Sequence, residues 1–136
     1  MGADSVAKSV ANRFNNVVRG IIWYCPQCGE EHLDASGCET VECPDCDVEM
    51  EQMTINDELQ DGWFNDEIIL STDDPAIVKD GSIMVGCGGP NVWVNSRSKK
   101  VEVYWWADYA EAPIDTDTAD AIREVLQDVW DIRRCE

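Results

Sequence analysis

Apolar residues recur at three- and four-residue steps near the start of the chain, which is the spacing of an amphipathic helix. The apolar stripe consists of Val6, Val10, Phe14, Val17, Val18 and Ile21. We expect Asp4 or Ser5 to cap this helix and Gly20 to end it, because short polar side chains favour the first position and glycine the last.

The second half of the chain alternates between apolar and polar residues, as strands with one buried face do. The candidate strands are residues 67–71, 82–87, 91–95 and 100–107. In the last strand, one face is expected to carry Val101, Val103, Trp105 and Ala107, and the other Glu102, Tyr104, Trp106 and Asp108. Aromatic residues would then lie on both faces of the sheet.

A second helical stripe lies near the end of the chain. It predicts a helix from Thr116 or Asp117 to about Arg134, with the apolar residues Ile122, Val125, Leu126, Val129 and Trp130. We expect this stripe to pack on the face of the sheet that carries Val101 and Val103.

Two copies of a short cysteine pattern stand between the first helix and the strands. Residues 25–29 read CPQCG and residues 43–47 read CPDCD, so fourteen residues separate two C-x2-C pairs: Cys25, Cys28, Cys43 and Cys46. Two residues between cysteines let both sulfurs reach one ion, and two such turns complete a tetrahedral thiolate site. The spacing predicts a zinc ribbon over residues 21–54 with one structural Zn²⁺.

Other cysteine chemistries use related patterns. Iron in a rubredoxin-like site takes similar thiolate tetrahedra, so the metal stays open between zinc and iron. A redox dithiol usually starts a helix, and neither pair is followed by a helical pattern. Cys38 and His32 lie between the two cysteine pairs at irregular spacings, so we do not expect them to be metal ligands. His32 is expected at the surface or beside the ligands. Cys87 and Cys135 are expected to be buried free thiols.

These residues carry a resemblance to known proteins. Residues 21–54 resemble the small CPxCG-type zinc-ribbon proteins of haloarchaea, although Asp47 stands where the second motif has glycine. The resemblance implies a type of module and not a particular activity. GCGGPNVWVN, followed by VEVYWW and a short helix, more weakly resembles small tailed-phage proteins of unknown function.

The patterns together predict an α+β fold in three parts. These are an N-terminal amphipathic helix at 1–20, the zinc ribbon at 21–54, and a small antiparallel sheet with a C-terminal helix at 65–136. Residues 55–64 are acidic and irregular and form the expected boundary. No apolar run approaches the roughly 20 residues of a membrane span, and no secretory signal is evident. We therefore expect a cytoplasmic protein without a membrane partner.

The net charge of the chain indicates the salt concentration at which it works. Its 28 acidic and 10 basic residues give a net charge of −18, which repels nucleic acid and weakens a compact fold by self-repulsion. Both effects shrink in molar salt, where the Debye length is about 3 Å. We therefore expect a protein of a halophilic archaeon with a salt-rich cytoplasm, or of its virus, in which case it could belong to the virion.

The few basic residues and several aromatic residues are candidates for contact with a partner. Lys8, Arg13 and Arg19 lie along the first helix, and Arg97, Lys99 and Lys100 lie at an expected turn. Trp93, Tyr104 and Trp106 are candidates for an aromatic platform beside that turn, suited to stacking bases. Core packing is the commoner use of such aromatic residues.

The remaining residues do not indicate an enzyme or a small-molecule substrate. The chain has one histidine, no serine elbow and no phosphate loop, and residues 86–90 lead into a strand, so they are expected to form a turn. Two functions remain. The preferred one is a non-enzymatic interaction or assembly protein that binds protein partners. The alternative is a nucleic-acid-binding regulator, which is disfavoured because the ribbon has no basic residue.

Overall fold

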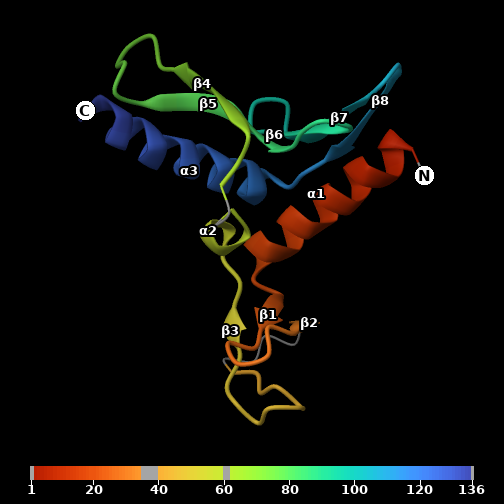
Figure 1. Cartoon of the computed structure of the whole chain (residues 1–136). Helices are drawn as coiled ribbons and strands as arrows, with labels where there is room; N and C mark the ends of the chain where they lie inside the picture. The colour runs from red at the N-terminus through yellow and green to blue at the C-terminus, as the bar shows by residue number, and fades with distance from the viewer. Residues whose placement is uncertain (1, 35–39, 60–61, 136) are drawn as a thin grey trace.

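The computed structural model describes residues 2–34, 40–59 and 62–135, and its fold is α+β (Figure 1). In chain order the elements are α1 (Ala3–Arg19), β1 (Ile22–Tyr24), β2 (Glu31–Leu33), β3 (Glu51–Gln52), α2 (Ile55–Glu58), β4 (Asn65–Leu70), β5 (Val78–Gly86), β6 (Asn91–Asn95), β7 (Lys100–Trp105), β8 (Asp108–Pro113) and α3 (Thr116–Arg134). A five-stranded antiparallel sheet has the order β4-β5-β6-β7-β8, and a three-stranded sheet has the order β2-β1-β3. The smaller sheet belongs to a cysteine-containing ribbon, which lies below the C-terminal end of α1 in Figure 1.

Helix α1 packs through alanines together with part of the predicted apolar stripe. Phe14 and Val17 of the stripe are buried, whereas Val6 and Val10 are only partly buried. The rest of the buried face is formed by Ala3, Ala7 and Ala11. Small side chains let the helix approach β7 and β8 closely. The helix ends at Gly20 as expected, with φ 76°, but its N-cap is Gly2 and no side chain caps it.

The predicted strand at 100–107 is two elements joined by a turn. β7 ends at Trp105, Trp106 and Ala107 turn the chain, and β8 runs back beside β7. Trp106 has φ 58°, a conformation usually taken by glycine, asparagine or aspartate. The turn was missed because its residues carry no turn signal, so the predicted face shared by Tyr104, Trp106 and Asp108 was also wrong.

The two long helices divide one face of the large sheet between them. Helix α3 begins at Thr116 as expected, but it packs mainly against β5, while α1 covers β7 and β8. The face with Val101 and Val103 is therefore covered chiefly by α1 and not by α3. Six large aliphatic side chains are fully buried in the shared core: Ile83, Val94, Val101, Val103, Ile122 and Leu126. Burial of each contributes roughly 1.5–3 kcal/mol.

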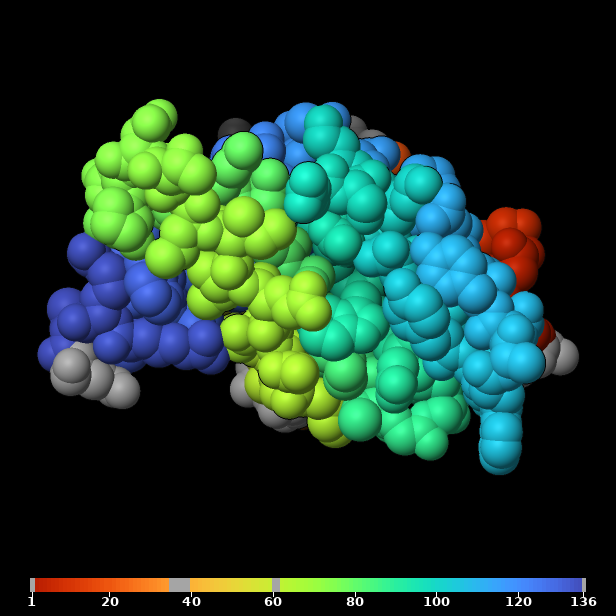
Figure 2. All heavy atoms as spheres, turned by 90° about the horizontal axis from the view of Figure 1, so that it is seen from above, coloured from red at the N-terminus to blue at the C-terminus, as the bar shows by residue number. Residues whose placement is uncertain are grey.

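Among the described residues, no helix covers the opposite face of the large sheet. Figure 2 shows this face, with β4 to β8 running across it and α1 and α3 visible at the margins. We call it the outer face. Because an antiparallel sheet can leave one face in solvent, the fold does not itself require a cover here.

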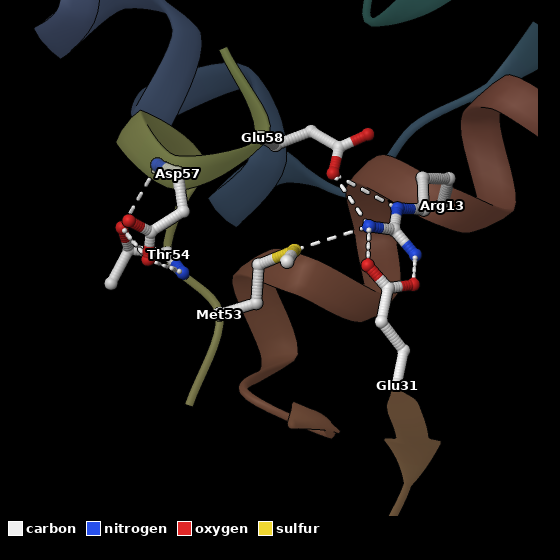
Figure 3. A network of polar contacts seen from close by, with 6 residues as sticks. All are labelled: Arg13, Glu31, Met53, Thr54, Asp57 and Glu58. Carbon is white, nitrogen blue, oxygen red and sulfur yellow. Dashed lines mark hydrogen bonds and ion pairs between the residues drawn. The ribbon is translucent and has the colours of Figure 1, made fainter. Parts of the chain in front are cut away.

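The predicted irregular boundary contains a short helix. In α2, the Thr54 hydroxyl accepts a hydrogen bond from the Asp57 amide, and the Asp57 carboxylate accepts one from the Thr54 amide (Figure 3). This capping box satisfies amides that the first turn of a helix leaves unpaired. It fixes the first turn of α2, which carries Glu58.

Candidate functional site: a four-cysteine metal centre and an uncovered sheet face

The two cysteine turns have the same backbone geometry. The Cys25 amide donates to the Glu30 carbonyl at 2.9 Å, and the Cys43 amide donates to the Val48 carbonyl at 2.9 Å. Each turn is also closed by a bond back to its first cysteine, from Gly29 and from Asp47. Gly29 has φ 77° and Asp47 has φ 58°. Asp47 therefore adopts the left-handed conformation of the glycine it replaces, which aspartate tolerates better than most residues.

The four predicted ligands lie together. The ligand atoms of Cys25, Cys28, Cys43 and Cys46 are within 4.8 Å of one another. The Cys28 and Cys43 sulfurs are 3.8 Å apart, and a tetrahedral site with metal–sulfur bonds of about 2.3 Å places its sulfurs about 3.8 Å apart. The cysteines are therefore positioned to hold one metal ion, and they form the only such cluster among the described residues.

The surroundings of the sulfurs suit a structural site. Cys25 and Cys43 are fully buried, and Trp23 and Met50 pack around them. The pKa of Cys25 is lowered to about 7, chiefly because the Cys28 amide donates to its sulfur at 3.4 Å. The pKa of Cys46 is raised to about 12 by hydrogen bonding to Cys28 and by burial. A bound cation is needed to hold all four as thiolates near neutral pH.

The histidine and the other cysteines that the structure describes lie outside this cluster. His32 lies in β2 opposite Trp23, and its Nε2 atom is 3.8 Å from a Glu30 carboxylate oxygen. Cys38 lies outside the described residues. Cys87 and Cys135 are exposed, which contradicts the expectation of burial. They follow the last residue of β5 and of α3, beyond the region where helices and sheet cover each other.

Arg13 joins three parts of the fold (Figure 3). Its guanidinium donates two hydrogen bonds to Glu31 of β2, at 2.6 and 2.9 Å, and two to Glu58 of α2, at 3.0 and 2.8 Å. The Met53 sulfur accepts a further one at 3.1 Å. These bonds raise the pKa of Arg13, and the guanidinium lowers the pKa of Glu31. Although it was predicted as a partner contact, Arg13 uses its guanidinium within the chain.

The other predicted basic contacts remain at the surface. Lys8 pairs with Asp4 at 3.0 Å, and Arg19 pairs with Asp115 at 2.7 Å, both in exposed positions. Lys100 pairs with Glu111 at 2.7 Å. Arg97 and Lys99 are exposed and have no ion pair among the described residues.

The predicted aromatic residues meet on the outer face but not beside the basic turn. Trp93 and Tyr104 line one pocket, Tyr104 and Trp106 line another, and Trp106 is 96% exposed. The turn with Arg97 and Lys99 stands at the opposite end of β7 from Trp106. Lys100, the first residue of β7, does share the outer face with Tyr104, and it pairs with Glu111.

Acidic residues and a further tyrosine surround the aromatic residues instead. Glu67, Glu102 and Glu111 lie on the outer face, as the strand register requires. The Tyr109 hydroxyl donates to Glu111 at 2.8 Å, and its ring lies 4.9 Å from that of Tyr104. Tyr109 was not among the predicted contacts because β8 was not predicted as a separate strand. The alternation of apolar and polar residues in β4 and β7 is the signal that places Glu67 and Glu102 on the outer face.

Comparison of the chain with protein-family models, with curated proteins and with solved structures found no match. Within the described residues, no helix has the length and apolar character needed to cross a membrane. The four-cysteine cluster suggests a zinc-binding domain, and it is the only functional assignment that the geometry makes directly.

Proposed function

We propose that this chain is a non-enzymatic interaction protein, stabilised by one structural Zn²⁺, that binds protein partners within a larger assembly. The observation that carries the proposal is the uncovered outer face with its exposed aromatic residues. Tyr104 is 47% exposed, Tyr109 45% and Trp106 96%. Aromatic residues are enriched in protein interfaces, where they supply much of the binding energy.

The proposed role of the metal follows from its ligands. Four thiolates fill the tetrahedral coordination of Zn²⁺ and leave no position for a substrate or an activated water. The same four ligands also accept iron, and zinc is preferred because no other feature of the chain calls for electron transfer. The metal then holds the ribbon together, and catalysis does not occur there.

The alternative of nucleic-acid binding has less support. The aromatic residues of the outer face stand beside Glu67 and Glu102, which repel phosphate. Lys8, Arg13, Arg19 and Lys100 are all paired with carboxylates of the chain. The net charge of −18 supports a setting in high salt, namely the cytoplasm of a halophile or a virion of its virus.

The proposal is tested by purifying the tagged protein from its native source in near-molar potassium chloride. We expect a defined complex with protein at fixed stoichiometry and no nucleic acid. The double variant Tyr104→Ser/Trp106→Ser should lose the complex but keep its metal and its circular dichroism spectrum. The matched variant Lys8→Glu/Arg19→Glu changes the exposed face of α1 and should retain it.

Three results would contradict the proposal. The first is a monomer without any partner. The second is salt-sensitive nucleic-acid binding with no protein lost on mutation. The third is loss of the complex only in the Lys8→Glu/Arg19→Glu variant, which would move the docking surface from the sheet to α1.

A further inference from the structure

A small cavity opens on the outer face over strands β4 to β7. It has a volume of about 250 Å³ and is lined by Glu67, Ser82, Trp93, Asn95, Glu102 and Tyr104. Ser82 lies in register between Glu67 and Asn95, so a small side chain stands among larger ones and leaves the space. Pockets for drug-sized ligands usually have about 300–1,000 Å³. This cavity fits a single side chain.

The lining combines aromatic faces with carboxylates. Trp93 stands directly opposite Glu102 in the β6–β7 pair, and Tyr104 follows Glu102 on the same face of β7. A ring face attracts a cation, and a carboxylate attracts it more strongly. An anion would face the repulsion of both Glu67 and Glu102. The chemistry therefore selects a cationic group.

The polar groups of the cavity are held in position, but not all of them have a hydrogen-bond partner. Asn95 donates to one oxygen of Glu102 at 3.0 Å, and Tyr109 approaches the other at 3.4 Å, so the carboxylate is held in position. Within the described part of the chain, the Glu67 carboxylate has neither a hydrogen bond nor an ion pair. The Ser82 hydroxyl has no hydrogen-bond partner there either, but it is not fully enclosed, since the only enclosed side-chain polar atom without a partner among the described residues is Nε2 of His32. The carboxylate and the hydroxyl therefore keep hydrogen-bonding capacity for a ligand atom.

The protein does not fill the cavity with a cation of its own. Lys100 lies on the same face, but its ammonium binds Glu111 at 2.7 Å, and Glu111 accepts a second bond from Tyr109. These bonds lower the pKa of Glu111, first through Lys100 and then through Tyr109. The nearest basic residue is thus turned toward β8, and the cavity keeps its two carboxylates.

We infer that this cavity binds an arginine side chain of the protein partner, with the guanidinium stacked against Trp93 or Tyr104 and hydrogen-bonded to Glu67 and Glu102. The inference rests on the proposed function and names the chemistry of the partner. Arginine fits better than lysine because its planar group stacks on rings and presents a fork of donors to carboxylates. The charge of −18 further favours a basic segment over an acidic one.

The test uses the isolated, metal-loaded protein and three short probes: acetyl-Gly-Arg-Gly-amide and its lysine and citrulline counterparts. Citrulline keeps the shape of arginine but lacks its charge. Indole N–H signals in ¹⁵N NMR spectra report binding, and the signal lost in Trp93→Phe identifies Trp93. We expect the arginine probe to shift the Trp93 signal and to bind about tenfold more tightly than citrulline, and more tightly than lysine.

Matched variants locate the binding. Glu67→Gln and Glu102→Gln should each weaken the arginine probe several-fold. Glu124→Gln, which removes the same charge from the exposed surface of α3, should leave it unchanged. Equal binding of arginine and citrulline, equal binding of arginine and lysine, or equal weakening by Glu124→Gln would overturn the inference. Because this experiment needs no partner, its failure leaves the proposed function standing. Failure of the proposed function is recognised separately, by the absence of a complex from the native source.

Discussion

Arg13 illustrates how one side chain can connect parts of a protein that are far apart in sequence. Its two carboxylate partners, Glu31 and Glu58, are 18 and 45 residues away. Charged hydrogen bonds of this kind are stronger than neutral ones, and Arg13 is only partly exposed. The sequence indicated that Arg13 lies along the first helix. It could not indicate the partners, because their approach depends on the positions of the ribbon and α2.

The first prediction concerns this residue. Arg13→Gln should lower the free energy of unfolding by about 1–3 kcal/mol, because Glu31 and Glu58 lose a shared cation and are left close to each other. Lys8→Gln is the control, and it should cost less than about 0.5 kcal/mol because the Lys8–Asp4 pair is exposed. Urea unfolding measures both. Equal effects of the two changes would contradict the structural role of Arg13.

The second prediction concerns pH. The folded protein lowers the pKa of Glu31 below its ordinary value of 4.5, through its hydrogen bonds with Arg13. The stability from this pair is therefore fully present above about pH 5 and is lost as the pH falls through the lower, folded pKa. The stability difference between the wild type and Arg13→Gln should be constant from about pH 7 to 5 and shrink toward pH 3. Urea unfolding at these pH values checks it, and a difference that grows on acidification would refute it.

Among the elements, the ribbon is the one whose folding we expect to depend on metal. Its strands have only two or three residues each, and its buried cluster is small. Small modules of this kind rarely fold on apolar burial alone, so metal binding and folding are coupled.

The third prediction follows from this coupling. The purified protein should contain one zinc per chain, and Cys28→Ser or Cys43→Ser should release it and unfold the ribbon. Cys87→Ser is the matched control, since that thiol is exposed and lies outside the cluster. Elemental analysis and ¹⁵N NMR spectra measure the two effects. Iron in place of zinc, or an intact ribbon without metal, would disprove the prediction.

The packing of α3 on β5 gives the fourth prediction. A methyl group on Gly81 would lie 2.3 Å from the Glu67 carbonyl oxygen and 2.4 Å from a Leu126 methyl carbon. Gly81→Ala should therefore destabilise the fold by about 1–3 kcal/mol through overpacking. Gly2→Ala is the control, because its nearest contact is an ordinary 3.5 Å. An unchanged melting temperature in Gly81→Ala would show that α3 does not pack closely against Gly81.

At the scale of the whole molecule, the net charge of −18 is the feature that most affects stability. Acidic residues lie on all three helices and on every strand except β1 and β6, so the repulsion is spread over the fold and not confined to one site. Such repulsion opposes any compact state until salt screens it.

The fifth prediction is a strong dependence of stability on salt. The melting temperature should rise steeply between about 0.1 M and 2 M potassium chloride, as the Debye length falls from about 10 Å to below 3 Å. Scanning calorimetry of the metal-loaded protein measures this, with potassium glutamate as a second salt to separate screening from anion effects. A flat melting temperature over this range would remove the case for a halophilic origin.

The sequence alone determined the features that depend on local pattern: both long helices, four of the sheet strands, the end of α1 at Gly20 and the four metal ligands. Each follows from spacing along the chain, either the periods of helix and strand or the reach of a C-x2-C turn. Only the tertiary structure decided which helix covers which strands, that β8 folds back at Trp106, and that Arg13 is an internal contact. It also placed Glu67, Trp93 and Glu102 around one cavity. The Trp106 turn is local, but its residues carry no turn signal. The other features arise where residues distant in sequence meet, and their side chains carry no local signal of the partners they will have.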